Sequence, residues 1–114
     1  MRQIELDGKD YLLGFKVVTP DLRSLGLRNN PHILQFVPSE WFMLPDSFLQ
    51  KGPSDWGGIW IARTLSQARN LSKYMADYHG RDTRLFATAI DEILYENSYR
   101  IKTNGVYLFE EVMY

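Results

Sequence analysis

The segment over 55–80 constrains the fold most, because it combines one short strand with one capped helix. Ile59–Ala62 is a continuous apolar run, which is typical of a strand that is covered on both faces. Thr64 stands three positions before Gln67, the spacing of a capping box that begins a helix. Apolar residues then recur at helical spacing as far as Gly80, which can adopt the left-handed conformation that ends a helix. The segment therefore predicts a buried strand followed directly by one long helix.

Strand patterns dominate the chain before and after this helix. Aromatic, β-branched or alternating runs predict further strands at 11–18, 33–37, 84–90, 98–101 and 106–113. The short alternating segment 3–6 can pair with 11–18 as a hairpin, because Asp7-Gly8 between them favours a turn with positive φ. Both ends of the chain are therefore expected to contribute to a sheet.

Three short segments carry helical signals. Thr19-Pro20-Asp21 suits the cap and first turn of a helix that Gly26 would end. The segments 39–42 and 91–95 each predict a single helical turn. None of these is long enough to act as a second principal helix.

Together these patterns predict an α+β domain. Strict alternation of strands and helices is absent, which disfavours a doubly wound parallel sheet. We expect a mixed, mainly antiparallel sheet of about six short strands packed on one principal helix over 65–79. The 114 residues suit a single domain, 1–114, and 45% of them are hydrophobic, which is enough for one core.

The composition excludes several classes of protein. The chain has no cysteine, which rules out a disulfide scaffold, a thiol nucleophile and thiolate metal sites. No apolar run reaches the roughly 20 residues that a membrane helix needs. The polar and charged start of the chain is unlike a signal peptide. We therefore expect a cytoplasmic protein without membrane contact.

Charge is unevenly distributed although the net charge is only −1. The middle of the chain is basic, with Arg63, Arg69, Lys73, Arg81 and Arg84. The C-terminal third is acidic, with Asp91, Glu92, Glu96, Glu110 and Glu111. The basic stretch is either the solvated face of a helix or a patch for an anionic ligand or an acidic partner. The overall balance argues against nucleic-acid binding.

Few residues point to catalysis or to metal binding. The histidines, His32 and His79, lie far apart, and neither metal-ligand spacing nor a nucleophile elbow nor a phosphate loop occurs, so no metal is expected. Glu110-Glu111 in the last predicted strand is the sharpest carboxylate signal, because alternation sends one glutamate to each face and one could point into a cleft. The alternative is a charged edge strand that resists pairing with neighbours.

Aromatic side chains could form a recognition surface. Trp60 lies within the apolar run and is expected in the core, whereas Trp41 and Trp56 flank a loop rich in proline and glycine. A flat aromatic side chain near Arg63 could stack a base or anchor a partner. The alternative is that these side chains pin the loop onto the core.

The order of the predicted elements in three segments resembles that of a known fold. The segments are a first strand ending in GFKVVTPD, the strand–helix unit GGIWIARTLSQARNLSKYM, and the late pair RLFATAI and VYLFEEV. In this order the chain resembles the ADP-ribosyltransferase-like fold of small bacterial and phage proteins. The motif positions that match loosely are Gly58, Thr64, Ser66, Ala68 and Tyr74.

The resemblance implies a cleft for NAD between two half-sheets. A catalytic set would then comprise Lys16, either Thr64 or Ser66, and either Glu110 or Glu111. Lys16 stands where the family has His or Arg, and no Glu-x-Glu or Gln-x-Glu precedes the last strand. Transfer from NAD passes through a cationic sugar that a glutamate must stabilise. If neither glutamate reaches the cleft, the fold is present without the activity.

Two functions from different classes follow. The first is a non-enzymatic protein-binding module without a cofactor, such as a phage- or toxin-system-related inhibitor. It would present Trp41, Trp56, Arg63, Arg69 and Lys73 to a protein partner. The second is an ADP-ribosyltransferase-like enzyme that acts on NAD. Nucleic-acid binding through the basic stretch with Tyr74 and Tyr78 is a third and weaker alternative.

Overall fold

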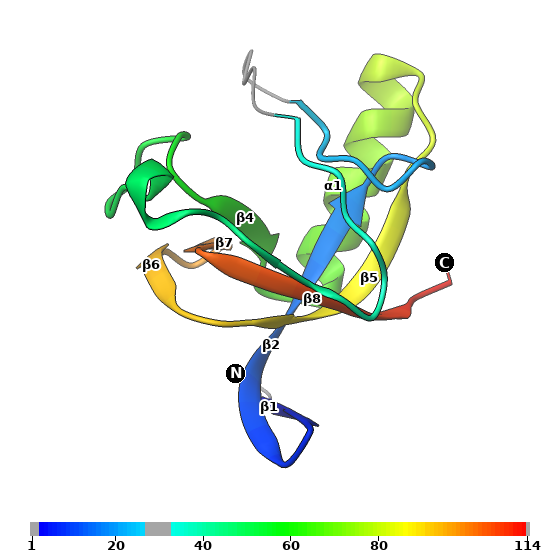
Figure 1. Ribbon diagram of the computed structural model, residues 1–114. Coiled ribbons are helices and arrows are strands. Elements are labelled where there is room, and N and C mark those ends of the chain that lie inside the picture. Colours follow the sequence, from blue (N-terminus) through cyan, green and yellow to red (C-terminus); the bar gives the residue numbers. More distant parts are fainter. Residues whose placement is uncertain (1–2, 27–32, 114) are drawn as a thin grey trace.

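A curved antiparallel sheet forms the centre of the protein in the computed structural model, which describes residues 3–26 and 33–113 (Figure 1). Its eight strands are β1 (Gln3–Leu6), β2 (Lys9–Val18), β3 (Trp41–Met43), β4 (Ile59–Ala62), β5 (Arg84–Ile90), β6 (Ile93–Glu96), β7 (Arg100–Thr103) and β8 (Gly105–Glu111). Their order across the sheet is β3-β8-β5-β2-β4-β7-β6, and β1 pairs with β2 alone. The fold is α+β, as predicted, but it has eight strands rather than about six.

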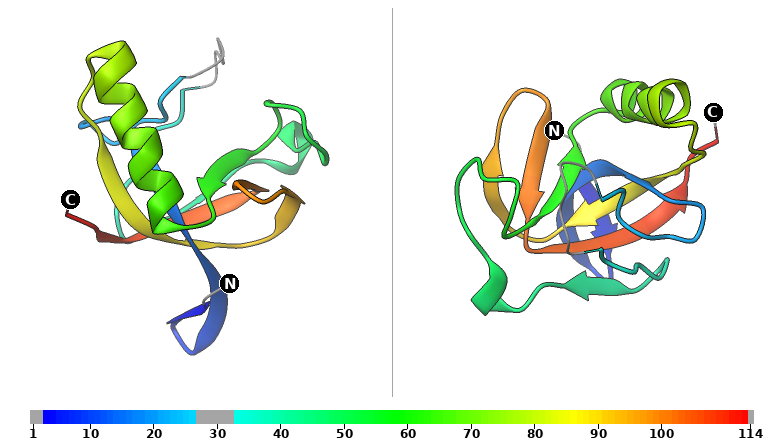
Figure 2. Two further views of the ribbon diagram at one scale, coloured as in Figure 1. Left: turned by 180° about the vertical axis from the view of Figure 1, so that it is seen from behind. Right: turned by 90° about the horizontal axis from the view of Figure 1, so that it is seen from above.

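The helix α1 (Leu65–His79) lies against one side of the sheet (Figure 2). The predicted capping box is confirmed, because the Thr64 hydroxyl accepts from the Gln67 N–H and the Gln67 side chain accepts from the Thr64 N–H. Gly80 ends the helix in the left-handed conformation, with φ of 60°. Buried Ala68 and Met75 pack the helix against β2 and β5. The local signals therefore determine where α1 begins and ends.

The sheet divides between β2 and β4. β2 pairs with β5 over seven residues, from Leu12↔Ile90 to Val18↔Arg84, but with β4 only at Phe15↔Ala62. Beyond that pair the two strands diverge, so that β3-β8-β5-β2 and β4-β7-β6 form two groups (Figure 1). Gly14 lies at the closest approach, where a Cβ atom would collide with Ile61. This divergence opens the space that contains the candidate site.

Two hydrophobic clusters cover the two faces of the sheet. The first lies beneath the segment 33–44 and joins both strand groups through Val18, Phe36, Ile59, Ile61, Phe86, Ile90, Ile101, Val106 and Leu108. The second lies beneath α1 and contains Val17, Leu25, Ala68, Met75 and Leu85. Because the first cluster spans the division, packing holds the two strand groups together where hydrogen bonds do not.

The short helix predicted over 19–26 is wrong. The Thr19 hydroxyl does accept from a backbone N–H, that of Arg23 at 2.9 Å, but it also donates to the Asp21 carboxylate. Leu22 has a positive φ of 65°, which no right-handed helix allows. The Thr19 side chain, predicted to cap a helix, therefore stabilises a turn instead. Arg23 then forms an isolated bridge with Gln35, which is all that appears of the strand predicted over 33–37.

The helical turns predicted at 39–42 and 91–95 are also wrong. Trp41–Met43 is β3, which pairs with β8 through Trp41↔Tyr107, and Ile93–Glu96 is β6, which pairs with β7. Both are edge strands of three or four residues. Their conformation is imposed by a partner distant in the sequence, so that local patterns carry little information about it.

No helix within 3–26 and 33–113 has the length and apolar character required to cross a membrane.

Candidate functional site

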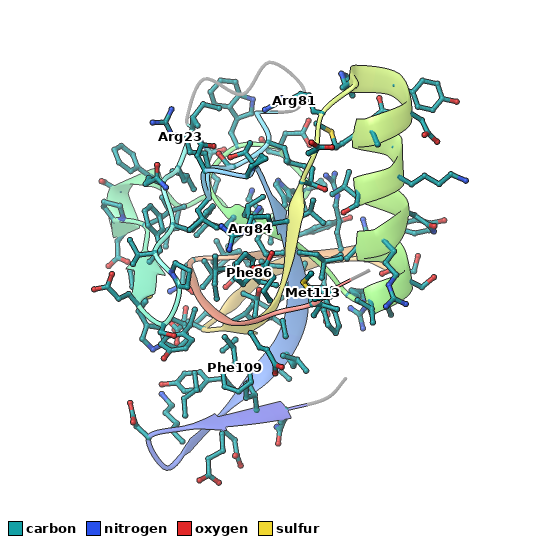
Figure 3. All side chains as sticks on the ribbon, turned by 90° about the vertical axis from the view of Figure 1, so that its right-hand side faces the viewer. Arg23, Arg81, Arg84, Phe86, Phe109 and Met113 are labelled. Atoms are coloured by element: carbon teal, nitrogen blue, oxygen red, sulfur yellow. The ribbon has the colours of Figure 1, made fainter. Side chains whose placement is uncertain are left out.

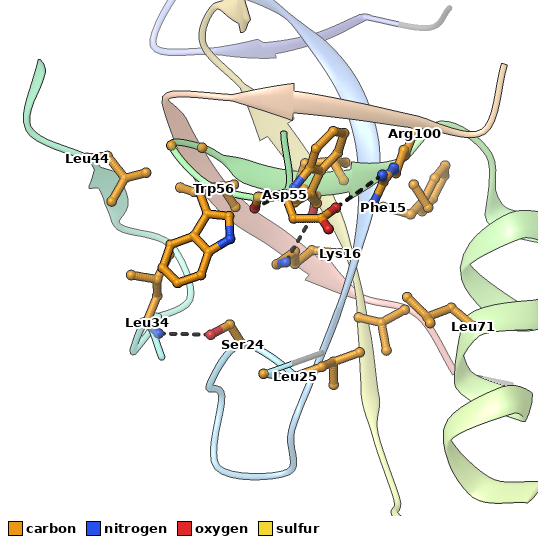
Figure 4. A pocket seen from close by; sticks show the side chains of 18 of the residues that line it. Phe15, Lys16, Ser24, Leu25, Leu34, Leu44, Asp55, Trp56, Leu71 and Arg100 are labelled. Carbon is orange, nitrogen blue, oxygen red and sulfur yellow. Dashed lines mark hydrogen bonds and ion pairs between the residues drawn. The ribbon is translucent and has the colours of Figure 1, made fainter. Parts of the chain in front are cut away.

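A cavity of about 650 Å³ opens where β2 and β4 diverge (Figure 4). It is bordered by β2, β4, the first half of α1 and the segment 44–58, which we call the rim loop. Its apolar and aromatic wall includes Phe15, Leu34, Leu44, Phe48, Trp56 and Trp60, and its polar wall includes Lys16, Ser24, Asp55, Gln67, Asn70 and Arg100. A volume of this size and a mainly apolar lining with a few polar groups are typical of small-molecule sites.

Lys16 places a buried amine on the cavity wall. Its side chain is 8% exposed, and its Nζ donates to the Trp60 carbonyl at 2.9 Å across the gap between β2 and β4. No carboxylate of the described residues forms an ion pair with it. Burial lowers the pKa of Lys16 to about 8, because the charged form loses its hydration without gaining an opposite charge.

A second group of contacts fixes the part of the cavity wall beside Lys16. The Arg100 guanidinium lies 3.8 Å from the centre of the Trp60 ring, and its Nη2 is 3.4 Å from the Asp55 carboxylate. The Trp60 indole N–H donates to the Asp55 carbonyl at 3.1 Å. Asp55 and Arg100 therefore pair with each other, and Figure 4 shows this contact beside Lys16.

Lys102 anchors the rim loop from below. It is fully buried, and its Nζ donates to the carbonyls of Gly52 and Ser54 at 3.3 and 3.0 Å. Burial lowers its pKa, against a smaller opposing effect of the Asp55 charge. Gly58 leaves room for its aliphatic stem, since a Cβ atom there would lie 2.5 Å from Lys102 Cγ. The anchored loop carries Trp56, which is 42% exposed, to the rim of the cavity.

Of the five residues proposed for catalysis, only Lys16 lines this cavity. The Thr64 hydroxyl is used as the helix cap, and Ser66 is exposed on the first turn of α1. Glu110 is exposed on β8. Glu111 receives two hydrogen bonds from Arg84, at 3.0 and 2.7 Å, and Figure 3 shows Arg84 above Phe86 on β5. The pKa of Glu111 is lowered by this bidentate contact.

The five residues proposed for partner binding lie in different places. Trp56 borders the cavity, whereas Trp41 packs between Tyr11 and Tyr107 with ring centres 4.8 and 5.6 Å away. Arg63 pairs with Glu96 at 2.7 Å.

Arg69 and Lys73 are the exposed members of this set on α1. They border a shallow depression beside Arg81. A protein partner for this face stays a prediction.

Sequence reasoning did not single out Asp55, Arg100 or Lys102. The useful signal was a single lysine inside an apolar strand, as in LLGFKVV and again in RIKTNGV. A lysine there must either reach solvent or find acceptors inside the protein. Asp55 and Arg100 gave no such signal, because their pairing depends on the fold.

His79 is the last residue of α1, does not line the cavity and meets the Tyr74 ring edge to face, with ring centres 5.2 Å apart. His32 lies outside the described residues. In the parts of the chain that the structure describes, no cluster of three or more His, Cys, Asp or Glu side chains could hold a metal ion.

Comparison with known proteins yields no match to a family model, to a curated protein or to a solved structure. The resemblance to the ADP-ribosyltransferase-like fold is therefore unconfirmed.

Proposed function

We propose that the protein binds a small anionic molecule with a planar ring in the cavity between β2 and β4. The observation that carries this proposal is the buried Lys16 amine, which faces the cavity without a carboxylate partner. A buried cation costs free energy unless it is paired, so an entering anion would offset that cost. Ligand binding would then be coupled to Lys16 protonation.

The rest of the lining supports the planar part of the ligand. Trp56 stands at the rim with a partly exposed indole, and an aromatic face is well suited to stack on a flat ring. Ser24 and Asn70 supply a hydroxyl and an amide group that can hydrogen-bond to polar substituents, whereas the Gln67 amide is bonded to the Thr64 N–H and the Ser98 carbonyl. Nucleotides combine these features, so they are the ligand class that we would test first.

NAD belongs to this class, so the alternative of an ADP-ribosyltransferase-like enzyme shares the binding step. Its catalytic step would require a glutamate at the reacting sugar. Glu110 and Glu111 lie outside the cavity lining, and Glu111 is paired with Arg84. We therefore propose binding as the function and retain NAD cleavage as the alternative to be tested.

Calorimetry with three probes tests the binding proposal. AMP carries a ring and a charge, adenosine only the ring, and pyrophosphate only the charge. We expect AMP to bind more tightly than either, and Lys16→Met to weaken AMP by about tenfold or more, equivalent to about 1.4 kcal/mol. Lys9→Met, which removes the charge of an exposed lysine outside the cavity lining, is the matched control. Absence of binding by all three probes, or equal AMP affinity in Lys16→Met, would overturn the proposal.

Mass spectrometry of nicotinamide decides the enzymatic alternative. Protein is incubated with NAD, and release is compared with that of the Glu110→Gln/Glu111→Gln double variant. Equal release by the two proteins would remove these glutamates from any NAD chemistry.

A further inference from the structure

We propose that Lys16 is a covalent capture site that forms an imine with small anionic aldehydes entering the cavity. This inference rests on the proposed function, because the anionic part of the aldehyde would be drawn in by the same site. It adds a reaction that simple anion binding does not require.

The reaction balances without any oxidant or reductant. The lone pair of the neutral Lys16 amine attacks the aldehyde carbon, and one amine proton is transferred to the former carbonyl oxygen to give a carbinolamine. The nitrogen lone pair then forms the C=N bond as the C–O bond breaks, and the departing hydroxide takes the second amine proton and leaves as water. Hydrolysis reverses each step, so capture is reversible.

The position of Lys16 suits this chemistry. It lies on β2 between Phe15 and Val17, and its backbone pairs with Phe86 of β5, which holds the side chain on a rigid element. The hydrogen bond to the Trp60 carbonyl uses one N–H and leaves the lone pair of a neutral amine available for attack. Reactive lysines are typically desolvated amines of this kind.

The neighbouring charges do not suppress the neutral amine. Asp55 and Arg100 lie on the same cavity wall, and each is engaged by the other. The Nζ of Lys16 also lies 5.7 Å from the centre of the Phe36 ring. With a pKa of about 8, roughly a tenth of Lys16 is neutral at pH 7. An ordinary lysine is neutral in fewer than about one molecule in a thousand.

The other lysines of the described residues provide internal controls. Lys9, Lys51 and Lys73 are exposed. Lys102 is buried, but its amine donates to two rim-loop carbonyls, and it does not line the cavity. Among the described residues, Lys16 is the lysine that combines burial with access to the cavity, so its selective labelling cannot be explained by exposure.

Pyridoxal 5′-phosphate is a suitable probe, because it carries a planar ring, a phosphate and an aldehyde. After brief incubation, borohydride reduces the imine to a stable secondary amine, and peptide mass spectrometry measures the labelling of each lysine. We expect Lys16 to be labelled at least tenfold faster than Lys9, Lys51 and Lys73. Its rate should rise with pH and level off above about 8, whereas the rates of exposed lysines keep rising to higher pH. Excess AMP should slow labelling of Lys16 and leave Lys51 unchanged.

Two measurements on the wild-type protein separate this inference from the proposed function, because labelling of Lys16 tests the capture site and calorimetry with AMP tests binding. Arginine cannot form the imine, so Lys16→Arg should lose cavity labelling. Because the lysines are compared within the wild-type protein, the main result does not depend on the variant folding. Labelling of Lys16 no faster than that of exposed lysines would overturn the capture site. If AMP still binds in that case, the proposed function stands, and if AMP also fails to bind, both fall.

Discussion

At the scale of single residues, the two buried lysines are the most unusual feature of the protein. Lys16 precedes buried Val17 and Val18 on β2, and Lys102 lies between buried Ile101 and buried Thr103 on β7. Each amine is matched to backbone carbonyls and not to carboxylates. Such hydrogen bonds satisfy the polar group but only partly replace its hydration, so both pKa values are lowered.

The lowered pKa of Lys16 predicts a specific pH dependence of stability. Its folded pKa of about 8 lies below the ordinary value of 10.5, so the unfolded chain holds the proton more tightly. The free energy of unfolding should therefore rise as pH increases from 8 to 10.5, by up to about 3 kcal/mol from this group. Urea unfolding of the wild type and of Lys16→Met, each at pH 7 and pH 10, measures this change in the free energy of unfolding. Lys102 titrates in both proteins, so only the wild type should show the additional rise. Parallel pH profiles would contradict the prediction.

Gly58 tests how tightly Lys102 is held. A Cβ atom at this position would lie 2.5 Å from Lys102 Cγ and 2.9 Å from its Cε. Gly58→Ala should therefore push the lysine from its rim-loop acceptors and lower the free energy of unfolding by about 1–3 kcal/mol. Combining it with Lys102→Ala removes the obstructing stem, so most of that cost should disappear in the double variant. Chemical denaturation of all four proteins checks this, and an equal cost of Gly58→Ala in both backgrounds would rule out the contact.

At the scale of elements, α1 shows how far local signals extend. The cap at Thr64 and the stop at Gly80 lie within the segment, where the sequence predicted them. The predicted apolar face packs on the sheet through Ala68, Leu71 and Met75, whereas Tyr78 at its end is exposed. The strands predicted over 11–18, 59–62 and 84–90 correspond to β2, β4 and β5, because long apolar runs also carry local information. β3 and β6 failed as predictions because each is short and defined by its partner.

The helix cap predicts a stability effect without an effect on the cavity. Thr64→Ala removes the acceptor for the Gln67 N–H and should lower the free energy of unfolding by about 1 kcal/mol. Thr64→Ser keeps a hydroxyl and should restore most of that loss. Because Thr64 does not line the cavity, AMP affinity should be unchanged in both variants. Denaturation and calorimetry measure the two quantities. A large loss of AMP affinity in Thr64→Ala at unchanged stability would instead support a role for Thr64 in the site.

At the scale of the whole molecule, the cavity arises from arrangement and could not be inferred from any one segment. It requires β2 and β4 to diverge after Phe15↔Ala62, and it requires the rim loop to be anchored by Lys102. These contacts join residues more than forty positions apart. Among the site residues predicted from sequence, Lys16 and Trp56 line the cavity, the first through the family resemblance and the second as an aromatic flanking a loop.

The division of the sheet predicts two levels of local stability. β4, β7 and β6 meet the rest of the sheet at one Cα pairing, so they can open together while β2, β5 and β8 stay paired. In hydrogen exchange at low denaturant, the amides of β7 should exchange with a lower opening free energy than those of β5. A ligand in the cavity would touch both β2 and β4, so saturating AMP should raise the opening free energy of the β7 amides more than that of the β5 amides. Lys16→Met lacks the amine that bridges β2 and β4. The opening free energy of β7 should therefore be lower in this variant and should rise less when AMP is added. One common opening free energy for β5 and β7, with and without AMP, would mean that the shared hydrophobic cluster makes the two groups a single cooperative unit.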